Sequence, residues 1–263
     1  MRMFLAVLLL ALSGLSQAAI KTQEIPYQSA DGTKLVGYYA YDDAIQGKRP
    51  GVVVVHEWWG LNDYTKRRAR DLAGLGYSAL AIDMYGDGKN TEHPKDAMAF
   101  MQAALKDSSA SNARFQAGLE LLKSQAQTDP NKIAAIGYCF GGAVVLNAAR
   151  QGVPLAGVVS FHGALATTTP ATPGKVKAKI LVEHGALDSM VTADNVTAFK
   201  AEMDKAGADY QFVSLDGAKH GFSNPDADRL GHGDHGGPDI GYNKAADEKS
   251  WADMQAFLKK IFS

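Results

Sequence analysis

The chain has 263 residues, with 27 basic and 28 acidic side chains and a formal net charge of −1. No charged block is longer than the basic triplet at residues 66–68, so the sequence has no patch suited to nucleic acid, and we expect no such partner. The length suits one large domain with a full hydrophobic core.

The N-terminus has the pattern of a secretory signal peptide. Arg2 precedes an apolar core at residues 3–12, and small residues follow up to Ala18, after which we expect cleavage. The apolar run is too short for a membrane-spanning helix, and no later segment is apolar enough for one. We therefore expect a signal peptide over residues 1–18, one domain over residues 19–263, a periplasmic or secreted location, and no stable membrane insertion after cleavage. The alternative is an uncleaved anchor or a disordered apolar end.

Short apolar runs alternate with segments of helical period along the rest of the chain. We predict strands at residues 34–41, 51–57, 78–83, 132–138, 155–163, 178–185 and 209–217. We predict helices from a cap at Asn62 or Asp63 to Gly74 or Gly76, over 94–126 as one or two helices, and over 141–150, 192–207 and 243–262. Repeated strand–helix–strand order predicts an α/β fold, with a mostly parallel sheet and helices on both faces. In such a sheet, the working site lies beyond the carboxyl ends of the strands.

Cys139 is the only cysteine of the chain, and it stands between Gly137 and Gly141. In an exported protein, an unpaired cysteine is a reactive thiol, an intermolecular partner or a small buried hydrophobe. The spacing Gly-x-Cys-x-Gly between a predicted strand and a predicted helix is that of a nucleophile elbow, and the helix N-terminus favours the thiolate. The pattern predicts Cys139 as a nucleophile.

Two further polar residues follow predicted strands, in the order that such a nucleophile needs. Asp188 follows the strand at 178–183, and His220 follows the strand at 210–215. An imidazole can take the thiol proton and return it to a leaving group, and a carboxylate can orient the imidazole. The order nucleophile, acid, base is that of α/β-hydrolases. A capping role for Asp188 and a core or surface role for His220 are the alternatives, and Glu183 is a second candidate for the acid although it lies within the strand.

The turn after the strand at 51–57 is predicted to complete the site. The backbone N–H groups of Trp58 and Phe140 are the expected oxyanion donors. Glu57 ends the same strand, and a carboxylate beside a thiol would raise the thiol pKa or accept its proton. A salt bridge or a helix-terminus contact is the alternative for Glu57. Trp59 is expected in the pocket wall.

Four motifs in this order resemble the dienelactone hydrolases, also called carboxymethylenebutenolidases, over nearly the whole mature chain: HEWWGLN from residue 56, GYCFGG from 137, GALD from 185 and KHGF from 219. The resemblance implies a single-domain α/β-hydrolase without metal or organic cofactor that opens a lactone ring. It implies Cys139 as nucleophile, His220 as base and Asp188 as its orienting acid. It also implies that Glu57 bonds the resting thiol and takes its proton when substrate displaces it.

Two departures from this family concern the arginines that hold a substrate carboxylate. One arginine position falls near Gly86 and Asp87, where the nearest cation is Lys89, and the other falls at Asn224. A guanidinium fork is hard to replace at a carboxylate site, so a small anionic lactone is not the expected substrate. We expect five side chains to line the substrate pocket: Trp59, Tyr85, Lys89, Phe222 and Asn224.

The remaining histidines and one loop raise a metal alternative. His232, Asp234 and His235 lie in a glycine-rich loop at 231–242 that is extra to the short form of the family. Their spacing fits no standard site, so we expect a loop over the pocket and no metal. Three strand-end histidines are expected in the core or the pocket wall, and one at the surface: His56, His162 and His184, with His93 outside.

The sequence therefore predicts an exported, cofactor-independent cysteine hydrolase that cleaves a small ester or lactone through a thioester intermediate. A broad-specificity carboxylesterase or thioesterase with the same residues is an alternative. A catalytically inactive binding protein of the same fold is another.

Overall fold

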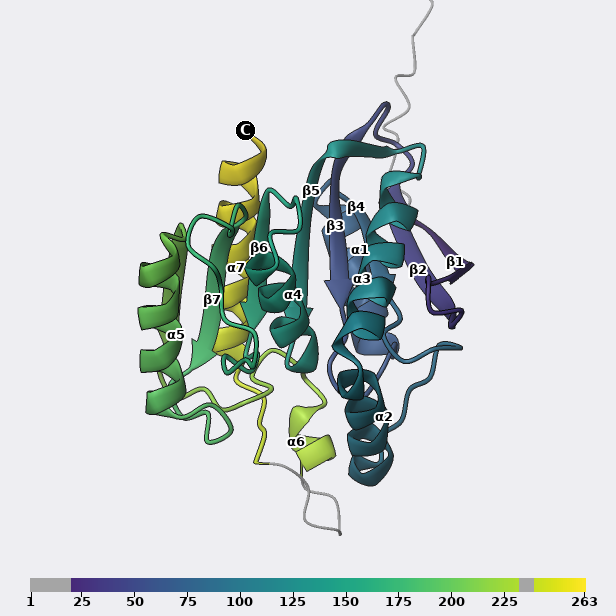
Figure 1. Cartoon of the computed structure of the whole chain (residues 1–263). Coiled ribbons are helices and arrows are strands. Elements are labelled where there is room, and N and C mark those ends of the chain that lie inside the picture. Colours follow the sequence, from purple (N-terminus) through teal and green to yellow (C-terminus); the bar gives the residue numbers. More distant parts are fainter. Residues whose placement is uncertain (1–19, 232–238) are drawn as a thin grey trace, which may run out of the picture.

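The computed structural model describes residues 20–231 and 239–263, and these form one eight-stranded sheet covered by helices (Figure 1). The strand order is β1-β2-β4-β3-β5-β6-β7-β8. Strands β3 to β8 pair in parallel, while β1 with β2 and β2 with β4 pair antiparallel. The strands are β1 (Ile20–Gln28), β2 (Lys34–Asp42), β3 (Arg49–Val55), β4 (Ser78–Ile82), β5 (Thr128–Tyr138), β6 (Gly157–Phe161), β7 (Lys179–Gly185) and β8 (Tyr210–Leu215).

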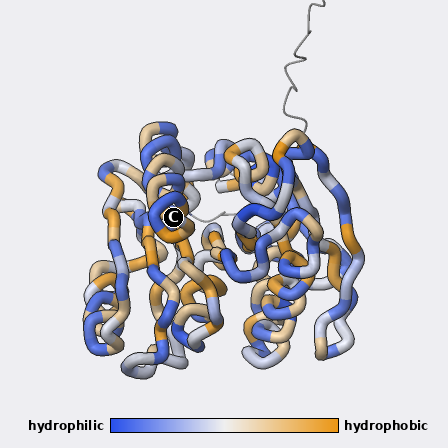
Figure 2. Tube along the Cα trace, turned by 90° about the horizontal axis from the view of Figure 1, so that it is seen from above, coloured by the Kyte–Doolittle hydropathy of each residue, from blue (hydrophilic) through white to orange (hydrophobic). Residues whose placement is uncertain are grey.

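The helices form two layers. In Figure 1, α3 and α4 cross in front of the sheet, whereas α1 and α7 lie behind it. Figure 2 shows helical turns that alternate between hydrophobic and hydrophilic, as expected when one side of a helix packs on a sheet and the other faces water. The helices are α1 (Asp63–Gly74), α2 (Pro94–Lys106), α3 (Ser108–Lys123), α4 (Phe140–Arg150), α5 (Ala193–Ala206), α6 (Ala227–Gly231) and α7 (Lys244–Phe262).

The valine run of β3 shows why this sheet needs both layers. Val53 and Val55 pack into the hydrophobic cluster beneath α3 and α4, and Val52 and Val54 into the cluster beneath α1 and α7. All four are fully buried, since alternate side chains of a strand point to opposite faces. A β-branched run without polar alternation is thus a central strand, as predicted.

The predicted α/β architecture is confirmed, with small differences at element ends and two elements that were not predicted. Asn62 caps α1, as expected, by accepting a hydrogen bond from the backbone N–H of Thr65. The segment at 94–126 is two helices, because Asp107 caps α3 through the amides of Ser109 and Ala110. Edge strand β1 and the single turn α6 were missed; β1 is mostly exposed and polar, so it has no apolar run to reveal it.

Glu183 is an ionisable side chain inside the core. It lies in β7 opposite Phe161 of β6 and is fully buried, and neither carboxylate oxygen has a hydrogen-bond partner within the described residues. Burial and the nearby Asp253 raise the pKa of Glu183 to about 8, although Lys249 opposes the shift. The carboxyl group therefore stays protonated in the folded protein at neutral pH. A protonated, buried carboxyl group does not suit the role of the acid that orients His220.

Glu183→Gln is expected to remove a pH dependence of stability. Because the folded-state pKa lies above the ordinary value of 4.5, the unfolded chain loses this proton first, and the free energy of unfolding falls as pH rises towards about 8. The fall attributable to this group should be about 4 to 5 kcal/mol, because the pKa rises from 4.5 to about 8 and each pKa unit corresponds to about 1.4 kcal/mol. Urea unfolding at pH 5, 7 and 9 measures it in wild type and variant. The control is Glu120→Gln at an exposed position, which should keep the wild-type slope; the same slope in Glu183→Gln would contradict the prediction.

Candidate active site

Cys139 lies in a sharp turn directly after β5 and caps the N-terminus of α4. Its φ of 52° and ψ of −115° are strained for a residue with a side chain. A Cβ atom on Gly137 would come within 2.0 Å of the Gly141 carbonyl oxygen, and one on Gly141 within 2.3 Å of the Val55 carbonyl oxygen. Only glycine fits both positions, so the predicted elbow is confirmed as a turn. The cysteine is partly exposed, which leaves its side chain within reach of a ligand.

Asp188 and His220 form a hydrogen-bonded pair beyond the ends of β7 and β8. Asp188 Oδ2 lies 2.8 Å from His220 Nδ1, and both side chains are buried. The two loops meet because β7 and β8 are neighbours and Leu187 N–H donates to the Ala218 carbonyl at 2.8 Å. Asp188 Oδ1 accepts two backbone N–H groups of its own turn. The carboxylate is therefore held in place and fixes the imidazole plane.

The other nitrogen of His220 is directed towards the nucleophile. Nε2 is buried and has no hydrogen-bond partner within the described residues. Burial alone would lower the pKa of His220, but the Cys139 sulfur beside it and the hydrogen bond with Asp188 together raise this pKa to about 10. The Cys139 side chain raises this pKa through its charge and through its contact with the imidazole, although no hydrogen bond to Nε2 forms within the described residues. The site favours the imidazolium form while Cys139 carries negative charge.

Glu57 lies two residues past β3 and is paired differently from the expectation. Its Oε2 accepts a hydrogen bond from Asn224 Nδ2 at 2.7 Å, and no hydrogen bond joins it to the thiol of Cys139 in the described structure. Burial raises the pKa of Glu57 to about 7, against the lowering effects of Asn224 and of His220. The carboxyl group can therefore gain or lose a proton near neutrality.

The two expected oxyanion donors come from neighbouring turns. The amide of Phe140 begins α4 and so has no acceptor within its own helix. The amide of Trp58 makes no hydrogen bond within residues 20–231 and 239–263. The Trp58 turn is fixed on both sides, since the Tyr85 hydroxyl donates to the Trp58 carbonyl at 3.0 Å and Gly60 N–H donates to the Glu57 carbonyl at 3.2 Å. Two N–H groups near the nucleophile thus remain available to a ligand oxygen.

The five expected pocket residues do not lie together. Trp59 and Asn224 line a cavity of about 390 Å³. Tyr85 and Phe222 are buried in hydrophobic clusters instead, because the Tyr85 hydroxyl is used to hold the Trp58 turn and Phe222 packs edge-on against the His162 ring. Lys89 is exposed, and it lines none of the described cavities. The assignment of Tyr85, Lys89 and Phe222 to the substrate pocket therefore stays a prediction.

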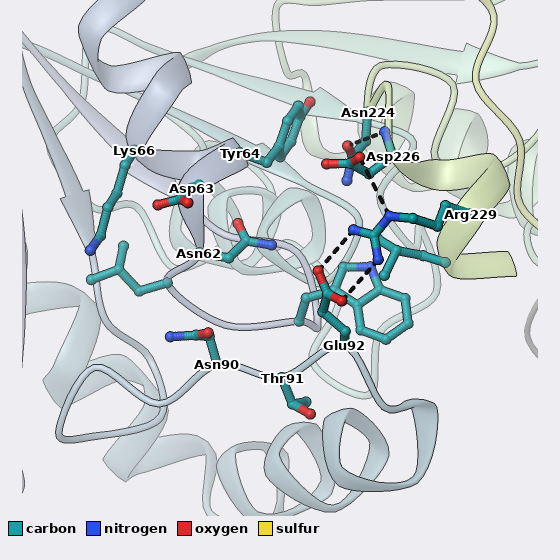
Figure 3. Close-up of a pocket in the computed structure, with 13 residues that line it drawn as sticks. Asn62, Asp63, Tyr64, Lys66, Asn90, Thr91, Glu92, Asn224, Asp226 and Arg229 are labelled. Atoms are coloured by element: carbon teal, nitrogen blue, oxygen red, sulfur yellow. Dashed lines mark hydrogen bonds and ion pairs between the residues drawn. The ribbon is translucent and has the colours of Figure 1, made fainter. Parts of the chain in front are cut away.

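Charged side chains line the cavity at Trp59 and Asn224, and Figure 3 shows that Arg229 is paired with Glu92 and Asp226. Two nitrogens of Arg229 each lie 2.8 Å from an oxygen of Glu92, and a third contacts Asp226 at 3.7 Å. Lys66 donates to Glu24 at 2.7 Å. Both cations in the described lining of this cavity therefore have carboxylate partners within the chain.

His162, directly after β6, is a site residue whose role the sequence did not reveal. Its ring packs edge-on against the His220 ring, with centroids 5.1 Å apart, and its Nε2 lies 2.8 Å from Ser223 Oγ. Burial lowers its pKa far below the usual range, so the imidazole is neutral. A positive φ of 41° places it there. Its position directly after a strand, which it shares with Cys139, was the available signal. His56 and His184 are also buried, and His93 is exposed, as expected.

The three residues of the metal alternative belong to a part of the chain that the structure does not describe. His232, Asp234 and His235 lie outside the described residues, as do the expected signal peptide and most of the loop at 231–242. Within the described ranges, no group of three or more histidine, cysteine or acidic side chains could hold a metal ion. In the same ranges, no helix combines the length and the apolar character that crossing a membrane requires.

Comparison with known proteins agrees with the fold and the motifs. The family model of the dienelactone hydrolase family matches residues 35–262. A crystal structure of a dienelactone hydrolase-like promiscuous phosphotriesterase from metagenomic libraries is 37% identical, with a TM-score of 0.85 over 93% of this chain and 100% of that one. Protein usf of Aquifex pyrophilus is 30% identical over 74% of this chain and 84% of its own length. MGS-M1, an α/β-hydrolase enzyme from a deep-sea metagenome library, shares the fold at 19% identity and a TM-score of 0.66, over 94% of this chain and 99% of that one. This chain belongs to the dienelactone hydrolase family of the α/β-hydrolase superfamily.

Proposed function

We propose that this chain, a carboxylic ester hydrolase, cleaves an uncharged ester or lactone with Cys139 as nucleophile. The observation that carries the proposal is the elbow at Cys139 beside the hydrogen-bonded pair of Asp188 and His220. The sulfur attacks the carbonyl carbon, and the carbonyl oxygen becomes an oxyanion bound by the N–H groups of Trp58 and Phe140. The thiol proton passes to His220 Nε2 and then to the departing alkoxide oxygen, which leaves a thioester on Cys139.

The electrostatics of His220 support a change of role between the two halves of this reaction. Before acylation, the negative sulfur raises the pKa of His220, which favours the proton-donating imidazolium. In the thioester, Cys139 carries no charge, so burial lowers the pKa of His220 and only Asp188 still raises it. The imidazole then takes a proton from water, the hydroxide adds to the thioester carbonyl, and the thiolate leaves with release of the acid.

Glu57 is proposed as a second acceptor for the thiol proton. Its pKa of about 7 and its place beside His220 suit a group that holds this proton when a substrate enters. Its hydrogen bond with Asn224 favours the ionised form, because an amide N–H stabilises a carboxylate more than a carboxylic acid.

Asn224→Leu is expected to move the acidic limb of the pH–rate profile to higher pH. If ionised Glu57 accepts the proton, kcat/KM of the wild type should rise with pH through the Glu57 pKa of about 7. Loss of one hydrogen bond to a charged group should raise that pKa by about one unit. Glu57→Gln should lose the limb altogether. Profiles of kcat/KM from pH 5 to 9 measure both effects. The control is Asn90→Leu, which removes another amide side chain from the same cavity. An acidic limb at the wild-type pH in Asn224→Leu would count against the role of Glu57.

The substrate class can be tested with matched esters. We expect the wild type to hydrolyse neutral p-nitrophenyl esters with a higher kcat/KM than an anionic dienelactone, because the cations of the charged cavity are paired. Iodoacetamide treatment and Cys139→Ala should both remove this activity. A clear preference for the anionic lactone would refute the substrate class. Background rates for every ester in the wild type would favour a binding protein instead.

Phosphotriester cleavage is a second candidate activity, favoured by the 37% identity with a relative whose name contains that activity. The same nucleophile and N–H donors would serve, with a phosphoryl oxygen in the place of the carbonyl oxygen. Including paraoxon among the substrates tests it.

We also propose that residues 1–18 direct export, on the pattern of Arg2, the apolar core and Ala18. Intact mass measurement of protein from the periplasmic fraction should give a chain beginning at Ala19. A mass that includes Met1 would refute cleavage.

A further inference from the structure

A second cavity, of about 500 Å³, lies on the face of the sheet covered by α3 and α4. The end of α2, the start of α3, one side of α4 along its length and the loop at 164–169 line it. No charged side chain and no histidine lines it among the described residues, in contrast to the cavity in Figure 3. Its volume is in the range of small-molecule sites.

The apolar lining faces the cavity, whereas several polar side chains around it bond to one another. The apolar part includes Met101, Leu105, Phe140, Ala143 and Val144. Among the polar residues, the side chain of Gln151 donates to Asn112 at 3.1 Å, and Thr167 donates to Asn147 at 3.3 Å. These amides and this hydroxyl already have hydrogen-bond partners. An apolar occupant would therefore leave fewer polar groups unsatisfied than the number of polar residues in the lining implies.

One wall of the cavity is formed by the residue that follows the nucleophile in sequence. Phe140, which lines it, follows Cys139 and contributes one of the two oxyanion N–H groups proposed above. Ala143, also in the lining, donates its N–H to the Cys139 carbonyl at 3.3 Å. Cys139 and Trp58 both pack against the hydrophobic cluster that contains Phe140 and Val144. Cys139 itself does not line the cavity, but the cavity and the nucleophile share the turn at Phe140 and the same hydrophobic cluster.

We propose that this cavity binds an uncharged apolar substituent of the ester, on its acyl or its alkoxy side. The inference rests on the proposed ester hydrolysis and adds where the substrate lies and what its substituent must be. Because burial of each methylene is favourable, kcat/KM should rise about threefold to fourfold per added methylene until the cavity is filled.

Two substrate series distinguish the two sides of the ester. p-Nitrophenyl esters from acetate to octanoate vary the acyl group, and alkyl acetates from ethyl to octyl vary the alkoxy group. The readout is the ratio of kcat/KM between the longest and the shortest member. A rise along one series in the wild type identifies the side that is bound, and no rise in either series overturns the proposal.

Two variants fill the cavity from different walls. Ala143→Phe acts from α4, and Ala166→Phe acts from the exposed loop, so a folding defect in one does not remove the test. The matched control is Asn90→Phe, which adds the same ring to the charged cavity. We expect the long-to-short ratio to fall at least tenfold in both cavity variants and to stay at the wild-type value in the control. An unchanged ratio in both variants, or a fall only in Asn90→Phe, overturns the proposal.

Failure of the proposed function itself would look different. In that case, the wild type would hydrolyse no member of either series. The cavity is then tested by binding of Nile red, an uncharged apolar dye. A dye affinity that is lower in Ala143→Phe than in wild type would retain the cavity as an apolar ligand site. Equal affinity would overturn it.

Discussion

His220→Ala is expected to lower kcat by about 10³-fold or more without unfolding the protein, since removal of a general acid and base of this kind costs about 10²–10⁴. His220 is the only imidazole that shares a hydrogen bond with Asp188 in the described structure and faces the sulfur with a free nitrogen. Its loss removes both the proton transfer to the leaving group and the activation of water. The measurement is single-substrate kinetics on p-nitrophenyl acetate, together with a thermal unfolding curve.

The control for this variant is His93→Ala, which changes an exposed histidine. It should keep the wild-type kcat. The kcat of Asp188→Asn should lie between those of His220→Ala and His93→Ala. The amide can place the imidazole in the wrong tautomer while leaving its position unchanged. Turnover at the wild-type rate in a folded His220→Ala protein would remove this histidine from the mechanism.

Cys139→Ser is expected to lose about 10²-fold or more in kcat/KM, and Cys139→Ala to fall to background. The hydroxyl is much less acidic than the thiol, so it does not supply the negative charge that raises the pKa of His220. The serine variant should therefore show a His220 pKa well below that of the wild type in an NMR titration. This second readout separates a change in the ion pair from a general defect.

Comparable kcat/KM in the serine variant would contradict the prediction. So would an unchanged His220 titration, because it would mean that another group raises the pKa of this imidazole. Unfolding curves for both variants serve as the control for folding, since the strained backbone at residue 139 is the same for cysteine, serine and alanine.

The hydrogen bond between Glu57 and Asn224 affects the protonation of the Glu57 carboxyl group. The resemblance led us to expect a departure from a family arginine at this position, and here the Asn224 amide donates a hydrogen bond to the Glu57 carboxylate. An amide donor lowers the pKa of Glu57 less than a guanidinium charge would, which leaves this pKa near neutrality.

The elements and the turn at Cys139 could be predicted because their causes are local. The valine run of β3 and the cap at Asn62 can be recognised within a few residues. The need for glycine at 137 is local too, since a Cβ there would meet the Gly141 carbonyl of the same turn. The need for glycine at 141 is not local, since a Cβ there would meet the Val55 carbonyl of strand β3. Strand β1 was missed because it lacks such a local pattern. It is an edge strand that is exposed on much of its length, so it has no apolar run.

The sequence by itself determined the α/β fold, the order of Cys139, Asp188 and His220 and their places after parallel strands, because hydrophobic period and turn chemistry depend on neighbouring residues. Only the tertiary structure decided that Glu57 bonds Asn224, that a neutral His162 supports His220, and that the apolar cavity lies beside Phe140 instead of around Phe222. Those outcomes depend on which loops meet at the edge of the sheet, and the loops meet through strand order and packing between residues far apart in the chain.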